Sequence, residues 1–151
     1  MSYNTKYMRI YNKRARYEYE LTSEKVEAGV ALRGIEARSL REGRGDLSQA
    51  HVRIMNGEAF LINANIPATG IEKYDPTRIR KLLLHRKELV ALEGKMKGKK
   101  LQLVPIALYN RKRLVKLELA LGKPKRQFEK KESLKQADIK RDLEREFKGN
   151  F

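Results

Sequence analysis

The side chains that could carry chemistry in this sequence are mostly Lys and Arg, with few of the kinds that enzymes use as nucleophiles or metal ligands. No cysteine is present, and the two histidines, His51 and His85, lie far apart in the chain. Disulfides, thiol nucleophiles and cysteine-based zinc sites are therefore excluded. No P-loop pattern and no His-Glu-x-x-His sequence occurs, and Gly43-Arg44-Gly45 is too short for a dinucleotide fingerprint. We expect no catalytic site, no metal and no cofactor.

The basic residues favour a polyanionic partner. The chain of 151 residues has 35 Lys and Arg against 19 Asp and Glu, a net charge of +16. Each phosphate that such a protein neutralises releases condensed counterions, so the excess favours nucleic acid. Tyr11, Tyr17, Tyr74 and Tyr109 lie near basic clusters, and an exposed ring beside a cation can stack on an unpaired base. Partial burial of these rings in a core is an equally good interpretation. The clusters are Lys13, Arg14 and Arg16; Arg78, Arg80 and Lys81; Arg86 and Lys87; Lys97, Lys99 and Lys100; and 111–113.

The first half of the chain shows strand-like alternation interrupted by one short helix. Residues 17–21 and 26–32 alternate, with Gly29 permitting a bend or bulge. Residues 35–41 fit a helix with Glu36, Arg38 and Arg41 facing water. Asn56-Gly57 between two alternating segments predicts a β-hairpin, because both residues tolerate positive φ.

The second half predicts a loop, a helix and two more strands. Residues 67–76 contain turn formers, residues 85–96 have helical spacing, and residues 101–106 and 115–121 alternate. Many short antiparallel strands favour a closed sheet, since closure removes exposed edges. We therefore predict a mainly β fold, a small closed antiparallel barrel with two or three short helices and a basic C-terminal tail.

Composition divides the chain into three parts. Residues 1–11 predict a flexible lead-in, residues 12–122 the RNA-binding barrel, and residues 123–151 a basic tail. The tail has ten Lys or Arg against six Asp or Glu, and Ile139, Leu143 and Phe147 form one thin apolar row. Such a row is too narrow for a buried helix, so we expect a tail that is disordered alone and helical when bound to a partner.

The order of several motifs resembles the SsrA-binding protein family along residues 12–131. The most specific segment is Asp75-Pro76-Thr77-Arg78-Ile79-Arg80-Lys81-Leu82-Leu83-Leu84-His85. The other matching segments are 12–16, 27–29, 34–41, 57–58, 103–105 and 119–121. The family's tail hinge and its Asp-Lys-Arg triplet correspond here to Lys123-Pro124-Lys125-Arg126 and Glu129-Lys130-Lys131.

The resemblance implies an oligonucleotide-binding barrel that holds the tRNA-like domain of transfer-messenger RNA (SsrA) and enters stalled ribosomes in trans-translation. It places Glu27, Leu83 and His85 on the RNA-binding face and implies that the tail probes the empty mRNA channel at the decoding centre. The RNA-binding residues expected from the resemblance and the basic clusters are Asn12, Lys13, Arg14, Arg16, Glu27, Arg38, Arg78, Arg80, Lys81, Leu83, His85, Arg86 and Lys87. The ribosome-binding residues expected in the tail are Lys123, Lys125, Arg126, Glu129, Lys130, Lys131, Lys135, Lys140 and Arg141.

Other interpretations stay open at this point. A different basic barrel protein of translation would bind ribosomal RNA directly, and an RNA-modifying or RNA-cleaving enzyme forms a third class. His85 could serve only as a helix cap or could hydrogen-bond a base or ribose. No apolar segment resembles a signal peptide or a membrane span, so we expect a cytoplasmic protein, monomeric and without a membrane partner.

Overall fold

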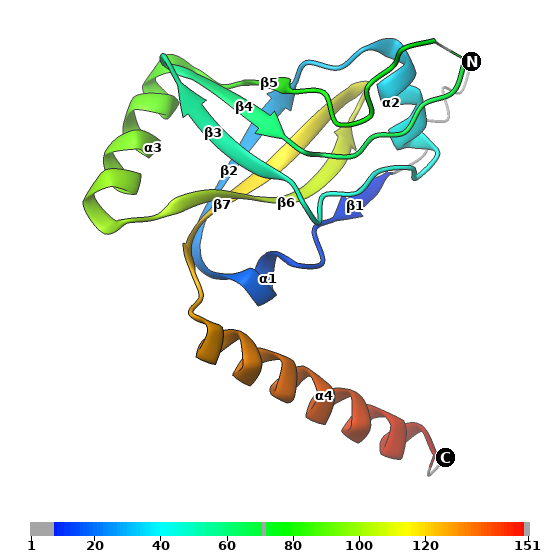
Figure 1. Ribbon diagram of the computed structural model, residues 1–151, viewed down its shortest axis with the longest axis vertical. Coiled ribbons are helices and arrows are strands. Elements are labelled where there is room, and N and C mark those ends of the chain that lie inside the picture. The colour runs from blue at the N-terminus through cyan, green and yellow to red at the C-terminus, as the bar shows by residue number, and fades with distance from the viewer. Residues whose placement is uncertain (1–7, 71, 150–151) are drawn as a thin grey trace.

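The fold is built on one antiparallel sheet, and the computed structural model describes residues 8–70 and 72–149 (Figure 1). The first elements are β1 (Arg9–Tyr11), α1 (Ala15–Glu18), β2 (Tyr19–Val30), α2 (Gly34–Arg41), β3 (His51–Met55) and β4 (Glu58–Ile62). The remaining elements are β5 (Arg80–Leu83), α3 (Arg86–Lys99), β6 (Gln102–Arg111), β7 (Leu114–Pro124) and α4 (Gln127–Gly149). The strand order is β1-β6-β7-β2-β5-β4-β3, with every pairing antiparallel.

The prediction of a closed barrel is wrong, although the fold is mainly β. Among the described residues, β1 and β3 are edge strands that no ladder joins, even though the sheet curls so that β3 and β4 cross in front of β6 and β7 (Figure 1). The edge of β6 that faces β3 is satisfied locally. Pro105 has no N–H to donate, and its carbonyl accepts from Asn12 Nδ2 at 2.8 Å. The Ile106 carbonyl accepts from the Asn12 N–H at 2.7 Å, so β6 needs no partner strand there.

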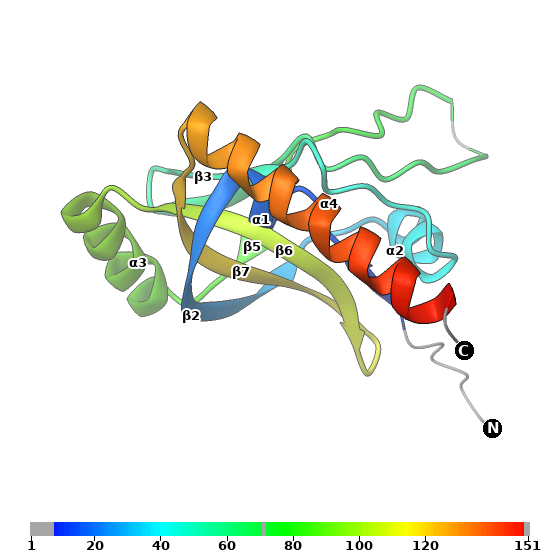
Figure 2. The same ribbon diagram turned by 90° about the horizontal axis from the view of Figure 1, so that it is seen from below.

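The core lies inside this curl and is made mainly of leucines. The side chains that are almost completely buried include Leu40, Leu47, Leu61, Ile66, Leu82, Leu108, Leu117, Leu119 and Leu121. Each contributes about 1.5–3 kcal/mol by leaving water. The helices α2 and α3 lie at opposite ends of the sheet (Figures 1 and 2). They bury only a few residues, which in α3 are Leu89 and Leu92.

The hairpin prediction is confirmed, whereas the predicted bend in the first strands lies elsewhere. Asn56 and Gly57 have φ of 52° and 74° and join β3 to β4, as a two-residue turn requires. Residues 19–21 and 26–30 of the two strand-like segments belong to one long strand, β2, whereas residues 17–18 belong to α1 and residues 31–32 follow the strand. Its register shifts between Leu21 and Lys25 rather than at Gly29.

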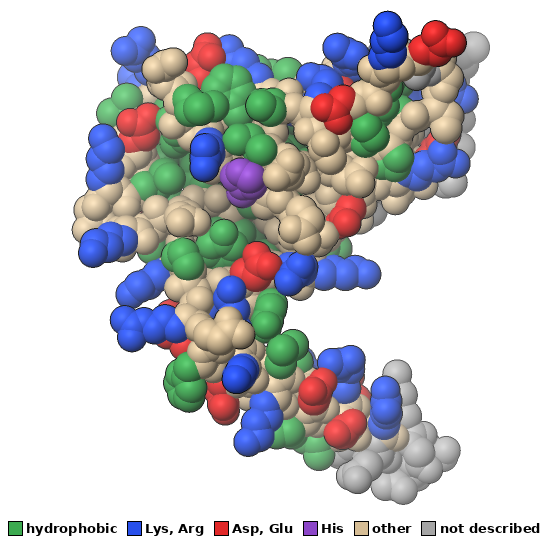
Figure 3. Space-filling model, in the orientation of Figure 1, with side chains coloured by type: hydrophobic (Ala, Val, Ile, Leu, Met, Phe, Trp, Pro, Cys, Tyr) green, Lys and Arg blue, Asp and Glu red, His purple; other side chains and the backbone are tan. Residues whose placement is uncertain are grey.

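The two ends of the chain differ in how they meet the sheet. Residues 9–11, within the expected lead-in, form β1 and pair with β6, while residues 1–7 lie outside the described part. At the other end, α4 extends away from the body (Figure 1). Hydrophobic, basic and acidic side chains alternate on its surface (Figure 3). Its apolar side chains Phe128, Leu134, Ile139 and Leu143 are exposed, while that of Phe147 lies outside the described residues.

Candidate nucleic-acid interface

Strand alternation places polar side chains on the outer face of the sheet. On β5, Arg80 and Leu82 point inward, so Lys81 and Leu83 point outward. On β7, Lys116 and Glu118 alternate with the buried Leu117 and Leu119. Glu27 and Gly29 share the outward side of β2, because Ala28 between them is completely buried. The strand pairing puts Gly29 beside both Leu83 and Lys116.

A hollow of about 500 Å³ opens where β5 meets α3. Lys81, Leu83, His85, Arg86 and Lys116 contribute to its lining. Leu83 is 56% exposed, and the His85 side chain is 90% exposed. A Cβ at Gly29 would lie 3.2 Å from the Leu83 Cβ, so the glycine allows β5 to pack closely there. The hollow combines an exposed apolar side chain with cations, as a surface that packs on a base beside a phosphate does.

His85 caps α3 through its backbone alone. Its carbonyl accepts from the Leu89 N–H at 3.0 Å, and its side chain makes no capping hydrogen bond. The imidazole Nε2 lies 4.0 Å from a carboxylate oxygen of Glu88. Of the two interpretations of His85, the structural one therefore accounts for the backbone and leaves the imidazole available to a ligand.

Glu27 lies about two residues along β2 from this hollow, and residues of β6 hold its carboxylate. The Tyr109 hydroxyl donates to Oε2, and Arg111 NH1 lies 3.3 Å from Oε1. Burial, followed by the hydrogen bond to Glu27, raises the pKa of Tyr109 to about 12. Tyr109 and Arg111 are absent from the predicted RNA-binding residues. Tyr109 lies opposite the outward-facing Lys116 in the β6–β7 hairpin, and Arg111, two residues further along β6, shares its strand face. This period-two spacing is a signal that could have found them.

A second groove of about 770 Å³ gathers the early basic residues. Asn12, Lys13 and Arg16 line it together with Lys125, which lies just before the tail helix. Lys125 Nζ donates to the Arg16 carbonyl at 2.7 Å, and the Lys125 N–H donates to the Glu18 carbonyl at 2.9 Å. The start of the tail is therefore fastened to α1.

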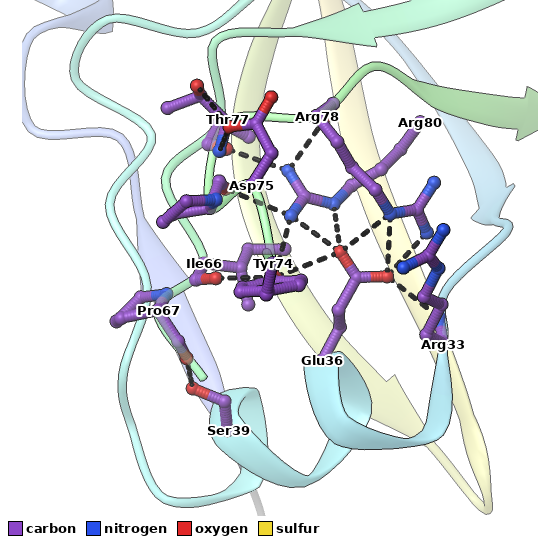
Figure 4. A network of polar contacts seen from close by, with 12 residues as sticks. Arg33, Glu36, Ser39, Ile66, Pro67, Tyr74, Asp75, Thr77, Arg78 and Arg80 are labelled. Atoms are coloured by element: carbon purple, nitrogen blue, oxygen red, sulfur yellow. Dashed lines mark hydrogen bonds and ion pairs between the residues drawn. The ribbon is translucent and has the colours of Figure 1, made fainter. Parts of the chain in front are cut away.

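Two predicted RNA-binding residues instead belong to a buried network (Figure 4). Glu36 and Arg80 are both 0% exposed, and Arg80 Nε donates to Glu36 Oε2 at 2.7 Å. Arg78 donates to the same carboxylate, from Nε at 3.1 Å to Oε2 and from NH2 to Oε1. The Tyr74 hydroxyl donates to the Ile66 carbonyl at 2.6 Å and lies 3.1 Å from Glu36 Oε2.

This network changes the assignment of three residues. The prediction that Glu36 faces water is wrong, because its carboxylate satisfies two guanidinium groups inside the fold. Arg80 is enclosed and cannot reach a ligand in this conformation, and Arg78 is mostly covered. The network fastens the segment between β4 and β5, which projects from the body in Figure 2, to helix α2.

The stability of the fold should depend on the charge of Glu36. Burial raises the pKa of Glu36, but hydrogen bonds from Arg78, the Arg33 N–H and Arg80 outweigh burial and lower it to about 2. A carboxyl whose folded pKa is depressed stabilises the fold above its unfolded pKa, near 4.3, and this contribution disappears as pH falls toward 2. It is on the order of 3 kcal/mol.

The measurement is urea unfolding at pH 7, 4.5, 3 and 2, compared between the wild-type protein and the Glu36→Gln variant. Other carboxylates titrate in both proteins, so the difference between the two curves isolates Glu36. A wild-type curve that runs parallel to that of the variant would contradict this expectation.

The remaining predicted residues lie on the surface in separate places. Arg38 is exposed on α2 and lies 3.8 Å from Glu42, and Arg14 lies 3.3 Å from Glu18. Lys87 is exposed on α3. Of the predicted tail residues, Lys123 lies at the end of β7, Lys125 and Arg126 connect β7 to α4, and the others lie along α4. Of these, Arg141 pairs with Asp138 at 2.7 Å.

Neither a metal cluster nor a membrane span is found in the part of the chain that the structure describes. No three His, Cys, Asp or Glu side chains of residues 8–70 and 72–149 gather as a metal site would require. None of the described helices combines the length and the apolar character needed to cross a membrane.

Comparison with known proteins gives one consistent family. The family model described as SmpB protein matches residues 9–149. The SsrA-binding protein of Sulfurihydrogenibium sp. (strain YO3AOP1) is 47% identical over 143 residues, covering 93% of each chain. That of Persephonella marina is 44% identical over 144 residues, again covering 93% of each chain. A solved structure described as "tmRNA-SmpB: a journey to the center of the bacterial ribosome" is 41% identical. It superposes with a TM-score of 0.65 and covers 83% of this chain and 94% of that chain.

Proposed function

The chain belongs to the SmpB family of SsrA-binding proteins, and from this premise we propose that it binds transfer-messenger RNA and brings it to stalled ribosomes for trans-translation. Its relatives are named for SsrA binding, and the solved structure it resembles is described as tmRNA-SmpB on the bacterial ribosome. We propose that it contacts the tRNA-like domain of this RNA. We also propose that it acts in the cytoplasm, where ribosomes translate. We assign the chain no catalytic step.

The observation that carries this proposal is the outer face around Glu27, Leu83 and His85. An exposed leucine and an exposed imidazole border one hollow among cations, and a carboxylate lies next to them on the same sheet face. Leu83 can pack on a base, and the cations can contact phosphates. A carboxylate repels phosphate, so the role of Glu27 is to accept a hydrogen bond from a base amine or to position a neighbouring Arg, and Arg111 NH1 lies 3.3 Å from its Oε1.

We divide the work between two parts of the chain. The body, residues 12–122, holds the RNA, and the tail, residues 123–151, contacts the ribosome along the mRNA channel. We no longer assign Arg78 and Arg80 to direct RNA contact, because their hydrogen bonds to Glu36 fix the segment that leads into β5. Asn12 satisfies the edge of β6, so its contribution to the RNA groove is to hold Lys13 and Arg16 in place.

The proposal is tested by replacing Glu27 with alanine and measuring affinity for a transcript of the tRNA-like domain. We expect binding to weaken by roughly 10- to 100-fold, the range for losing one specific contact to a base edge. The direction of the change in affinity is informative, because removing a negative charge from a basic protein should otherwise strengthen RNA binding.

Glu24→Ala is the matched control for this experiment. Glu24 lies on the same strand and pairs with Lys95 at 3.1 Å, in an exposed position. This variant should bind the transcript as tightly as the wild-type protein or slightly more tightly. If Glu27→Ala binds the transcript as tightly as the wild-type protein or more tightly, the proposed contact of Glu27 with a base is wrong. If the wild-type protein does not prefer this transcript over ribosomal RNA, the proposed function is wrong.

A further inference from the structure

Two side chains of β6 reach across a neighbouring strand to hold the Glu27 carboxylate. The Tyr109 hydroxyl donates to one carboxylate oxygen, and Arg111 NH1 lies 3.3 Å from the other. Strand β7 lies between β6 and β2, so these contacts span two strand spacings, about 10 Å in all. Each carboxylate oxygen therefore has a protein donor, and the Glu27 side chain remains 30% exposed, so the carboxylate has further lone pairs with which to accept from a ligand.

Tyr109 is itself fixed by its neighbours on the outer face. The guanidinium carbon of Arg9 lies 5.3 Å from the centroid of the Tyr109 ring and 5.2 Å from that of Tyr11. Arg9 NH2 lies 3.3 Å from one Glu118 oxygen, and Lys25 Nζ lies 3.4 Å from the other. Cations and acceptors thus alternate across β1, β6, β7 and β2, and each side chain restrains the next.

We propose that Tyr109 and Arg111 are positioning residues for RNA recognition, which fix the Glu27 carboxylate so that it accepts a hydrogen bond from an exocyclic amine of a nucleobase. This inference rests on the proposed function. A free glutamate side chain loses rotamer entropy when it is fixed on binding, whereas a carboxylate already held in place loses little. Arg111 also offsets the negative charge that the approaching phosphates would meet.

A competing role for Tyr109 is stacking of its ring on a base, and the two roles respond differently to substitution. Tyr109→Phe removes the hydroxyl and keeps the ring, whereas Tyr109→Leu removes both. Positioning needs the hydroxyl, and stacking needs only the ring. Tyr11 provides the matched control, because its ring also contacts Arg9 while its hydroxyl makes no hydrogen bond within the described residues.

The experiment measures affinity for the tRNA-like transcript with Tyr109→Phe, Glu27→Ala and the double variant. We expect Tyr109→Phe to bind about tenfold more weakly, as for loss of one hydrogen bond to a charged group. In the Glu27→Ala background, the same substitution should cause no further loss, since no carboxylate remains to be positioned. The slope of log affinity against log salt should stay unchanged, because no phosphate contact is removed.

Arg111→Gln keeps the test independent of any folding defect at Tyr109, since Arg111 is exposed. It should weaken binding in the wild-type background more than in the Glu27→Ala background. Tyr11→Phe should bind like the wild-type protein. Two results would overturn the inference. One is unchanged RNA affinity in Tyr109→Phe together with weaker binding in Tyr109→Leu, and the other is a loss of affinity in Tyr109→Phe that adds fully to the loss in Glu27→Ala. Tight RNA binding by the wild-type protein in the same assay would leave the proposed function intact.

Discussion

Replacing Glu36 with alanine is expected to lower the free energy of unfolding by about 3–5 kcal/mol, the cost of removing one partner from a buried ion pair. Arg80 is completely buried and Arg78 mostly so, and both donate to this one carboxylate. Without Glu36, the Arg80 guanidinium keeps its hydrogen bonds to the carbonyls of Ala64 and Pro76 but has no counter-charge. Since domains of this size are stable by only about 5–15 kcal/mol, much of the margin would disappear.

The measurement is urea unfolding at pH 7, with Glu42→Ala, at the C-cap of the same helix, as the control. Glu42 lies 3.8 Å from Arg38 and 3.6 Å from Arg44, and all three side chains are exposed. Exposed pairs of this kind contribute about 0–1 kcal/mol, so the control should unfold close to the wild-type midpoint. If the two variants lose similar stability, the buried network does not have the importance assigned to it.

A consequence for RNA binding follows from where the network lies. Arg80 is the first residue of β5, and Leu83 is its last. The hydrogen bonds from Arg80 and Arg78 to Glu36 thus fix the entry to the strand that presents Leu83 and, two residues later, His85. Residues that never touch RNA can in this way determine the geometry of the RNA-binding face.

Local sequence signals were sufficient to predict the β3–β4 hairpin and the helices α2 and α3. The hairpin at Asn56-Gly57 was predictable because positive φ at two successive residues selects a two-residue turn. The helix predicted at 35–41 is α2, and the one predicted at 85–96 lies within the region of α3. In both, apolar residues recur at helical spacing before a glycine, which makes such segments predictable without knowledge of the rest of the chain.

Features that depend on contacts between distant residues were not predictable in the same way. Helical spacing alone places Glu36 among polar neighbours, and only the approach of Arg78 and Arg80 from 42 and 44 residues away makes burial favourable. One signal was present, because Arg80 shares a strand face with Leu82. The sheet stays open where Asn12 and Pro105 satisfy the edge of β6, and hydrophobic periodicity does not indicate how the polar groups of a strand edge are satisfied.

Ending the chain after Lys125 is expected to leave RNA binding within about twofold of the full-length protein. The body keeps β7 to its end at Pro124, and Lys125 keeps its hydrogen bonds to the carbonyls of Arg16 and Glu18. The apolar side chains of α4 that the structure describes are exposed, so their removal costs the core nothing. Eight tail cations are lost with it, namely Arg126, Lys130, Lys131, Lys135, Lys140, Arg141, Arg145 and Lys148. All but Arg126 belong to α4, which extends away from the body (Figure 1).

The same truncation is expected to abolish rescue, with tagging of the stalled peptide falling at least about 100-fold, because the proposed contacts of the tail with the ribosome are lost. A fall of that size corresponds to an activation barrier about 2.7 kcal/mol higher. Helix α4 has 23 residues and so reaches about 35 Å from the body. A rod of that length with cations along it can enter an RNA-walled channel that the body cannot reach. The assay is peptide tagging in a reconstituted translation system with ribosomes stalled on a truncated message.

Full-length protein with Asp138→Ala is the control, because it breaks the exposed Asp138–Arg141 pair and keeps the arm and all of its cations. It should tag stalled peptides at close to the wild-type rate. Loss of tagging with retained RNA affinity would separate the two parts of the chain, since binding depends on the body and engagement of the ribosome on the arm. Tagging by the truncated protein would contradict this division, and the ribosome contacts would then have to come from residues 1–125.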